Sequence, residues 1–318
     1  MLKLLASVIM WMCAGYAVAK TYDLPADGSD VIGSTDYVYA TYEDTLPDIA
    51  RRHGLGYEEI VKANPGVDPW LPGEATKVVL PTQYVLPQAP REGIVVNISE
   101  MRLYYYPPAK NGQPRQVVTY PISIGRVDWQ TPLGLTQIVS KRKNPTWYPP
   151  ESIRKEHAEA GDPLPAVVGP GPDNPLGQHA LNLGISGYLI HGTNKPAGVG
   201  MQVTHGCIRL YPENMETLFS AVDVGVKVRL VDQPYKVGWH EGRLYLEAHG
   251  AIGKSAVEPQ TAKNNTPVVK AIIAATEQRA ANIEWSKLGS IIDRADGIPV
   301  PISIGQGSAN DQLARLME

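Results

Sequence analysis

Alternating apolar and polar positions dominate the middle of the chain, between about residues 92 and 231. Short runs there are rich in β-branched and aromatic residues, and turn residues such as Ser99-Glu100 and Asn111-Gly112 separate them. We therefore expect a mainly β domain in this part of the chain. The pattern predicts strands at 94–97, 102–106, 117–124, 136–141, 180–183, 188–190 and 227–231, and a helix at 213–221.

One stretch of this domain, from Asn144 to Gly177, lacks the alternation and is dense in Pro and Gly. A long insertion without regular structure inside a compact domain is usually functional, often as a lid or a substrate wall. We expect an irregular lid here, with Trp147 and Tyr148 beside a binding cleft.

A smaller unit is predicted between residues 37 and 82. Val38 and Tyr39 begin a short strand, and Asp44-Thr45 can cap a helix with an apolar face. A second helix is expected at 57–63 and a closing strand at 77–80. The order is β-α-α-β. The preceding residues 20–36 are polar and rich in Gly, Asp and Ser, and we expect them to be a linker.

The C-terminal extension, residues 233–318, carries no pattern that suggests chemistry. It contains a small hairpin at 243–248, a polar linker near 254–265 and helical spacing at 267–284. We expect it to pack on the β domain or to cap it.

The first 19 residues have the pattern of an export signal. Lys3 gives a positive start, Leu4 to Met12 form an apolar run, and Ala17-Val18-Ala19 offers a cleavage site. The run is too short for a stable membrane anchor. A buried N-terminal helix is the alternative. We expect residues 1–19 to be removed, leaving a secreted protein.

The net charge and the cysteine content limit which partners and which covalent bonds we expect. The net charge of −3 and the pI of about 6.2 give no basic stripe, which argues against nucleic acid as a partner. Removal of the signal would also remove Cys13, so the mature chain keeps only Cys207 and cannot form an internal disulfide.

Cys207 is the main candidate for chemistry. It stands in Thr204-His205-Gly206-Cys207-Ile208-Arg209, and His191 lies sixteen residues upstream after an apolar run. A thiol attacks a carbonyl as the thiolate, and a neighbouring imidazole can take its proton. The alternative is a small buried side chain without reactivity. Export and the two His-Gly pairs favour a nucleophile for acyl transfer.

The neighbouring residues suggest roles in the same chemistry. The Gly192 carbonyl could orient the His191 imidazole, and Gly206 would allow a sharp turn that frees the Gly206 and Cys207 amides for an oxyanion. A helix close after Cys207 would lower the pKa of its thiol. Arg209 supplies a positive charge for a substrate carboxylate.

Three alternatives stay open at this stage. His205 could be a core histidine, and Arg209 could pair with a buried carboxylate. His191, His205 and Cys207 could also be zinc ligands, although no acidic general base stands nearby in sequence. We expect neither a metal nor a cofactor. The remaining histidines are expected to be surface or structural residues: His53, His157, His179, His240 and His249.

Two resemblances extend this interpretation. His191-Gly192-Thr193 followed by 204–210 resembles the signature of the L,D-transpeptidase (YkuD) family, and 100–106, 131–134, 145–147 and 171–175 also fit. The whole arrangement is most similar to its ErfK/YbiS/YcfS/YnhG branch. Residues 37–82 resemble a LysM module, a family that binds N-acetylglucosamine-containing glycans, although Glu43 stands where glycine is usual.

The resemblance implies a β-sandwich or flattened barrel with a cleft under a lid. It implies a periplasmic enzyme in which Cys207 attacks the bond between diaminopimelate at position three and D-Ala at position four of a peptidoglycan tetrapeptide stem. In that reaction His191 is the general acid and base, with Gly192 holding it. His205 and Gly206 would shape the oxyanion pocket, and Arg209 would bind stem charge.

The acyl acceptor is left open by the resemblance. An amine of a second stem gives 3→3 cross-links, the terminal lysine of an outer-membrane lipoprotein gives anchoring, and water gives L,D-carboxypeptidase activity. Carbapenems are the expected inhibitors. A non-catalytic wall-binding protein is the alternative from another class.

Overall fold

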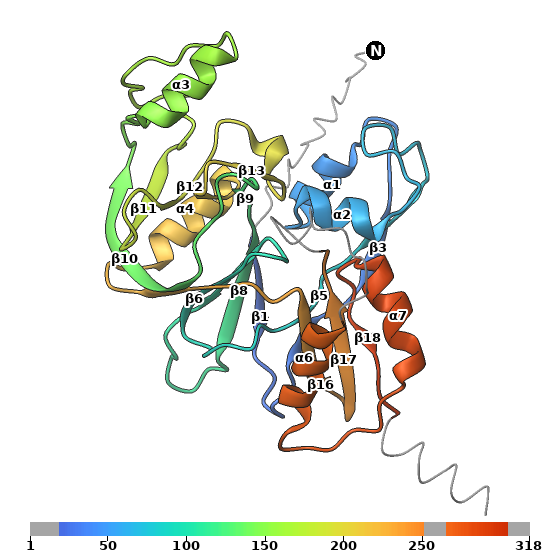
Figure 1. Cartoon of the computed structure of the whole chain (residues 1–318). Coiled ribbons are helices and arrows are strands. Elements are labelled where there is room, and N and C mark those ends of the chain that lie inside the picture. The colour runs from blue at the N-terminus through green and yellow to red at the C-terminus, as the bar shows by residue number, and fades with distance from the viewer. Residues whose placement is uncertain (1–18, 251–264, 305–318) are drawn as a thin grey trace, which may run out of the picture.

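A nine-stranded sheet, mostly antiparallel, forms the centre of the computed structural model, which describes residues 19–250 and 265–304 (Figure 1). The prediction of a mainly β protein is confirmed. In order of pairing, the strands are β1 (Lys20–Asp23), β8 (Gln116–Pro121), β7 (Arg102–Tyr106), β6 (Gly93–Asn97), β15 (Lys227–Val231), β10 (Gly134–Lys143), β11 (His179–Leu183), β12 (Leu189–His191) and β14 (Ile208–Arg209).

The inner face of this sheet builds the main core. Ile94, Leu103, Ile138 and Leu181 are fully buried there. The helix α4 (Pro212–Ala221) packs on β11 through its apolar side, which includes Leu218. The helix and the strands lie close to the positions that the apolar pattern predicts.

The expected linker at residues 20–36 is wrong. β1 pairs with β8 at the edge of the main sheet, and β2 (Val31–Gly33) pairs with β5 (Gln83–Val85). Their partners lie far away in sequence, so a local composition rich in Gly and Asp gave no sign of the pairing. Of the expected export signal, residues 1–18 lie outside the described residues.

The expected irregular insertion contains a helix, α3 (Glu151–Glu159). Only Ile153 of α3 is buried, so the helix lacks the apolar stripe by which a sequence pattern is recognised. At the base of the insertion the buried amide of Asn174 donates to the carbonyls of Pro145 and Gly169, at 2.8 and 3.0 Å. These hydrogen bonds anchor the base of the insertion, while α3 lies away from the sheet (Figure 1).

The small N-terminal unit has the predicted β-α-α-β order. It comprises β3 (Asp36–Tyr39), α1 (Leu46–Arg52), α2 (Tyr57–Ala63) and β4 (Lys77–Leu80). The Thr45 side chain accepts a hydrogen bond from the Asp48 amide and caps α1, as the sequence suggested. Leu46, Ile49 and Ile60 fill its core.

Backbone contacts fix this unit on the β domain. At the start of α2 the amides of Tyr57 and Glu58 donate to the carbonyls of Val199 and Gly200, at 3.0 and 3.1 Å. These amides have no partner within their own helix, so the neighbouring loop satisfies them. Gly200 has a φ of +88°, and a Cβ there would lie 2.3 Å from the Tyr57 nitrogen. Only glycine allows so close an approach.

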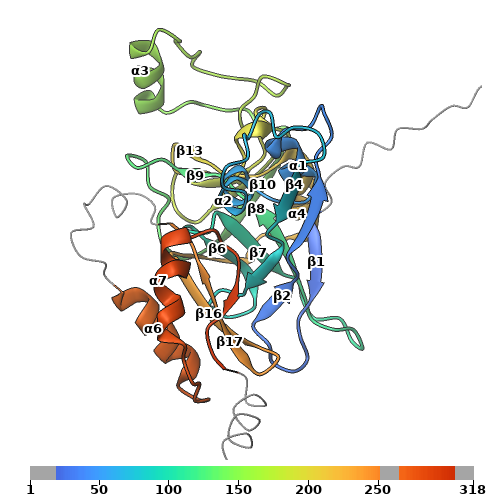
Figure 2. The same ribbon diagram turned by 90° about the vertical axis from the view of Figure 1, so that its right-hand side faces the viewer.

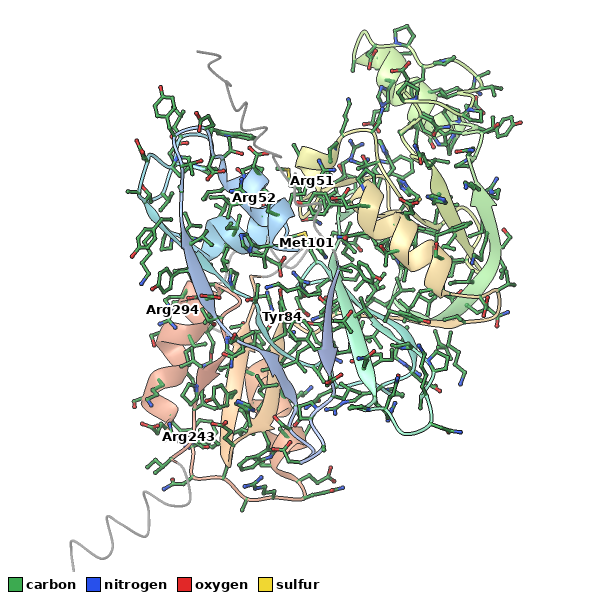
Figure 3. All side chains as sticks on the ribbon, turned by 180° about the vertical axis from the view of Figure 1, so that it is seen from behind. Arg51, Arg52, Tyr84, Met101, Arg243 and Arg294 are labelled. Carbon is green, nitrogen blue, oxygen red and sulfur yellow. The ribbon has the colours of Figure 1, made fainter. Side chains whose placement is uncertain are left out.

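Two ion pairs reinforce the same interface. Arg102 of β7, almost fully buried, donates to the Glu59 carboxylate and to the Gly54 carbonyl. Arg51 of α1 makes a two-point contact with Glu213 of α4, at 2.8 and 2.9 Å. Figure 3 shows Arg51 at the boundary between the small unit and the β domain.

Within the described residues, the C-terminal extension consists of a three-stranded sheet and the helices α6 (Thr266–Thr276) and α7 (Trp285–Arg294) (Figure 2). Its strands are β16 (Tyr235–His240), β17 (Arg243–Ala248) and β18 (Val300–Pro301). The single helical stretch expected at 267–284 is therefore wrong in extent, since α6 ends early and α7 was not predicted. Most of the expected linker at 254–265 lies outside the described residues.

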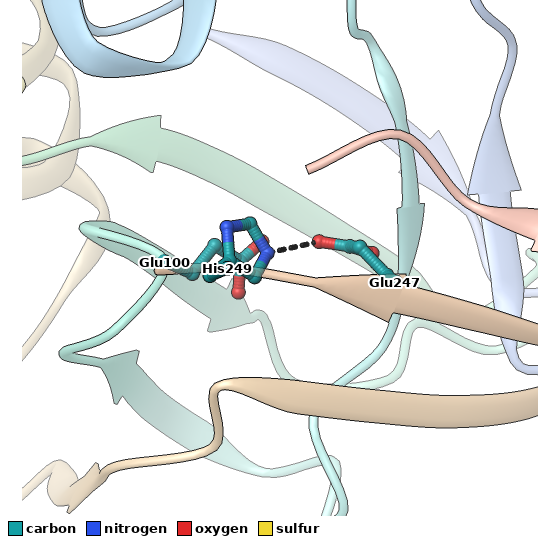
Figure 4. A group of neighbouring side chains, drawn as sticks. All are labelled: Glu100, Glu247 and His249. Atoms are coloured by element: carbon teal, nitrogen blue, oxygen red, sulfur yellow. Dashed lines mark hydrogen bonds and ion pairs between the residues drawn. The ribbon is translucent and has the colours of Figure 1, made fainter. Parts of the chain in front are cut away.

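A buried ionic cluster joins this extension to the β domain, and Figure 4 shows three of its members, Glu100, Glu247 and His249. The ammonium of Lys236 lies 2.8 Å from carboxylate oxygens of both Glu100 and Glu247, and no part of these three side chains is exposed. His249 contacts Glu247 at 2.7 Å. Burial favours a higher pKa for Glu100, but Lys236 and neighbouring donors hold that pKa below its usual value.

The same cluster has donor atoms suited to a metal. Ligand atoms of Glu100, Glu247 and His249 lie within 4.8 Å of one another. Lys236 already supplies a cation to both carboxylates, so we interpret the group as an ion-pair junction. Among the helices in the described part of the chain, none is long and apolar enough to cross a membrane.

Candidate active site

The parallel pairing of β12 with β14 brings the two candidate catalytic segments together. Ile190 pairs with Ile208, and His191 pairs with Arg209. Ile190 and Ile208 are both in the core, and side chains alternate along a strand. His191 and Arg209 therefore point to the opposite face, where Cys207 also contributes to the wall of the same cleft.

The His191 imidazole is buried and held by backbone carbonyls. Its Nδ1 lies 2.6 Å from the Gly192 carbonyl oxygen, the contact expected from the sequence. A carbonyl only accepts, so Nδ1 carries the proton and Nε2 keeps its lone pair. Burial, with a smaller effect of the Arg209 charge, lowers the pKa of His191 to about 3. The ring is therefore a neutral base at neutral pH.

The Cys207 thiol is half-buried in the wall of the same cleft. Its Sγ lies 3.7 Å from the Gly187 carbonyl oxygen. Burial raises the pKa of the thiol, against smaller opposing effects of a backbone hydrogen bond at Leu189 and the Arg209 charge. Our conditional expectation of a pKa lowered by a helix dipole does not apply, because β14 separates Cys207 from α4. The resting pair is a thiol and a neutral imidazole.

Two threonines shape the loop that carries the thiol. The Thr204 hydroxyl donates to the Cys207 carbonyl at 2.6 Å and accepts from the Gly206 amide at 3.2 Å. Thr131 donates to the Gly206 carbonyl at 2.9 Å. Gly206 has a φ of +98°, and a Cβ would lie 2.8 Å from the Tyr188 ring. The sharp turn expected at Gly206 is present, but its amide is engaged rather than free.

Arg209 lies in the cleft without an ion-pair partner among the described residues. Its Nε is buried and makes no hydrogen bond in that part of the chain. The alternative in which Arg209 neutralises a buried carboxylate therefore has no support in this geometry. A guanidinium with an unused donor at the nucleophile is suited to an anionic substrate group.

The cleft around these residues has a volume of about 440 Å³. The insertion forms one wall with Trp147, Tyr148 and Ile153, and the motif strands form another. His205 is partly exposed at the edge of the cleft, where its Nε2 lies 3.2 Å from Glu156 of α3. His205 is thus neither a core residue nor a member of the Cys207–His191 pairing.

The zinc alternative receives no support from the geometry. Within residues 19–250 and 265–304, the donor atoms that lie close enough for a shared ion belong to Glu100, Glu247 and His249, not to the cleft.

Comparison with known proteins shows the family of this chain. Residues 91–230 match the profile of the L,D-transpeptidase catalytic domain. The chain is 40% identical over 293 residues to the probable L,D-transpeptidase YcfS of Escherichia coli, covering 90% of this chain and 89% of the relative. The chain belongs to the L,D-transpeptidase family.

Further relatives show the same agreement along nearly the whole chain. The probable L,D-transpeptidase ErfK/SrfK of Salmonella typhimurium is 37% identical, with 92% of this chain and 94% of the relative covered. The probable L,D-transpeptidase YbiS of E. coli is also 37% identical, with 90% and 93% covered. The protein is an L,D-transpeptidase of peptidoglycan, as the motif around Cys207 predicted.

Sequence reasoning missed several residues of this L,D-transpeptidase site. Thr131 was quoted within a family motif but not as a support of the Cys207 loop. Arg126 and Glu156, which meet His205 under the lid, were not predicted at all. The charge pattern contained no signal for them, because Glu156 follows Arg126 by thirty residues across the insertion.

Proposed function

We propose that this L,D-transpeptidase cleaves the bond between diaminopimelate at position three and D-Ala at position four of a tetrapeptide stem, through a thioester on Cys207. The observation that carries the proposal is the pairing of β12 with β14, which directs a backbone-held neutral imidazole and a thiol into one cleft. Both groups are then in the protonation state that general-base attack needs.

The first half-reaction begins with proton transfer. Nε2 of His191 takes the thiol proton as Sγ attacks the scissile carbonyl, forming the S–C bond of a tetrahedral intermediate. The C–N bond then breaks, His191 returns the proton to the leaving amine of D-Ala, and the thioester remains. In the second half an amine attacks the thioester carbonyl and gives a proton to His191. The C–S bond then breaks as the new amide forms, and His191 returns the proton to the Cys207 sulfur.

The oxyanion needs a donor that the protein does not already use. The Gly206 amide donates to Thr204, whereas no partner of the Cys207 amide is found among the described residues. We assign the Cys207 amide to the oxyanion, with His205 and Gly206 as residues that shape the turn. Arg209 is assigned to a stem carboxylate.

Mass spectrometry of the purified mature protein tests the nucleophile. A carbapenem is expected to add its mass at Cys207, and Cys207→Ser should show no adduct. With a tetrapeptide substrate, His191→Gln should lower kcat by roughly 10²- to 10⁴-fold while the fold is kept. An unlabelled but folded wild-type protein would favour the alternative of a non-catalytic wall-binding protein.

The acceptor is best identified in cells. Muropeptide analysis of a deletion strain should lose diaminopimelate–diaminopimelate dimers if a second stem is the acceptor. Loss of lipoprotein-derived remnants would instead assign anchoring through a terminal lysine. Accumulated tetrapeptides with neither product changed would assign L,D-carboxypeptidase activity.

The small unit of residues 37–82 is proposed to bind the glycan of the wall, as its resemblance to LysM modules implies. Its support is a group of exposed apolar side chains on the loops after β3 and α2: Tyr42, Trp70 and Leu71. Aromatic faces of this kind are enriched where proteins meet ligands. Sedimentation with purified peptidoglycan should weaken in Trp70→Ala and stay unchanged in the control Trp285→Ala, a similarly exposed tryptophan on α7.

The proposed location is the periplasm. It is supported by the export pattern of residues 1–19 and by the peptidoglycan substrate. Cell fractionation followed by N-terminal sequencing should give a periplasmic protein that starts at Lys20. A full-length protein in the cytoplasm would contradict this.

A further inference from the structure

A single carboxylate of the lid contacts the loop that carries the nucleophile. Glu156 of α3 places one oxygen 2.5 Å from Nη2 of Arg126 and the other 3.2 Å from Nε2 of His205. The side chains of Glu156 and Arg126 are each 36% exposed, so water reaches the contact. The hydrogen bond from Arg126 lowers the pKa of Glu156, which is therefore a carboxylate at neutral pH.

The two donors belong to the rigid part of the site. Arg126 donates its amide to the Thr204 carbonyl at 3.0 Å, directly after β9 (Ile124–Gly125), which pairs with β13 (Gln202–Thr204). A Cβ on Gly125 would lie 2.8 Å from Cα of Gly206, so this turn is packed on the Cys207 loop.

The Trp129 ring positions the second donor. It meets the His205 imidazole edge-on at 5.2 Å, and both rings are at the wall of the cleft. Burial lowers the pKa of His205, although Glu156 opposes this effect. The imidazole therefore contributes mainly an N–H donor, and Arg126 contributes the charge. A cation and a donor fixed beside the nucleophile form a carboxylate-binding pair, whereas Glu156 comes from a helix with a single buried residue.

We propose that Arg126 and His205 bind a carboxylate of the donor stem, and that Glu156 occupies this position in the free enzyme. The inference rests on the proposed function for its substrate class. A stem peptide carries carboxylates on both sides of the scissile bond, including the terminal D-Ala carboxylate and that of the D-isoglutamyl residue. Entry of the stem would exchange Glu156 for the substrate carboxylate and release α3 from the Cys207 loop.

This position is distinct from that of Arg209. Arg209 lies on β14 with a buried Nε, beside His191 in the sheet. His205 lies at the edge of the cleft, and Arg126 is joined to it through Glu156 of α3. Exposed ion pairs contribute little stability, so the exchange requires no large loss of protein contacts. The two arginines can therefore hold two different carboxylates of one stem.

Calorimetric binding of a synthetic tetrapeptide stem to Cys207→Ala protein tests the proposal without turnover. In this background Arg126→Gln should weaken binding roughly three- to tenfold, and Glu156→Gln should tighten it by a similar factor, since the competitor is removed. Arg126→Lys should restore part of the affinity. The matched control is Glu159→Gln, on the same helix, whose ion-pair partner among the described residues is Lys155 at 3.9 Å, and it should bind like its parent.

Three amidated stems identify the carboxylate. If the Arg126→Gln penalty disappears with a terminal D-Ala carboxamide, the terminal carboxylate is the ligand. If it disappears with isoglutamine at position two, the D-isoglutamyl carboxylate is the ligand. If it disappears when the free carboxylate of diaminopimelate is amidated, that carboxylate is the ligand.

The proposal is overturned if the penalty persists with all three amides, or if Glu156→Gln binds no better than Glu159→Gln. Failure of the wild-type enzyme to release D-Ala would refute the proposed function instead, and the binding result would still stand.

Discussion

Two of the ionic contacts that join distant parts of this chain differ clearly in burial. Lys236, Glu100 and Glu247 are completely buried between the extension and the β domain, whereas Glu156, Arg126 and His205 meet in partial contact with water. A buried charge that loses its partner keeps the full cost of desolvation, while an exposed one regains water. The first contact is therefore permanent, and the second can be exchanged for a ligand.

The largest expected effect comes from breaking the buried contact. Lys236→Met leaves two carboxylates without their cation and should lower the free energy of unfolding by about 3–5 kcal/mol. Denaturant unfolding measures this loss. The control Lys155→Met removes an exposed lysine of α3 and should stay within about 0.5 kcal/mol of wild type. Equal effects of the two substitutions would contradict the comparison.

The next effect concerns the buried imidazole of the site. The pKa of His191 is about 3 in the folded protein, below the 6.5 of a free imidazole. As pH falls from 6.5 toward 3, the unfolded chain takes up a proton that the folded site does not. Stability should therefore fall by about 1.4 kcal/mol per pH unit in this window.

Unfolding of wild type and His191→Asn at pH 6 and pH 4 isolates this contribution. The variant should lose less stability between the two pH values, because its side chain does not titrate. His205→Gln, which removes a less buried imidazole, should change the pH dependence less. On the acidic side of the pH profile of kcat/KM, the apparent pKa should lie well below 6.5. An apparent pKa near 6.5 would mean that His191 is not the neutral base described above.

A contact of intermediate burial should give a smaller effect. Arg51 and Glu213 pair with good geometry between the small unit and α4, but Arg51 is 39% exposed. Arg51→Ala should cost no more than about 1 kcal/mol of unfolding free energy. Lys62→Ala breaks a more exposed pair with Glu58 and serves as the control, with a loss of a few tenths at most. A loss of several kcal/mol in Arg51→Ala would show that burial does not rank these contacts.

The smallest global effect is expected at the lid. Glu156→Gln should leave the denaturation midpoint unchanged, because its carboxylate is exposed. Amide hydrogen exchange within α3 should nevertheless become faster, since the helix loses its contact with the Cys207 loop. Glu159→Gln should alter neither quantity. A clear fall in the denaturation midpoint of Glu156→Gln would show that the lid contact contributes to global stability, as the buried contact does.

The sequence predicted elements whose signals are local. The two short helices of the small unit were located because Thr45 caps one and Asn64-Pro65-Gly66 ends the other. Strands of the main sheet were located because their apolar residues alternate or cluster. The motif around Cys207 and His191 was recognised because the chemistry needs those residue types at close positions.

Elements defined by distant partners were not predictable in this way. β1 contains Lys20 and Asp23 and becomes a strand by pairing with β8. α3 has one buried residue, and Lys236 looks like a surface lysine until Glu100 and Glu247 enclose it. The Gly206 amide was expected to be free because its acceptor, the Thr204 hydroxyl, depends on a loop conformation that no residue pattern specifies.

The contact at Gly200 has a consequence for how the enzyme meets a polymer. Main-chain atoms of the small unit and the β domain touch there, with no intervening side chain that could flex. A sugar chain bound to the unit would arrive at the nucleophile with one orientation and one spacing. Stems that project from successive sugars in different directions would then be selected by their angle, before any peptide contact is made.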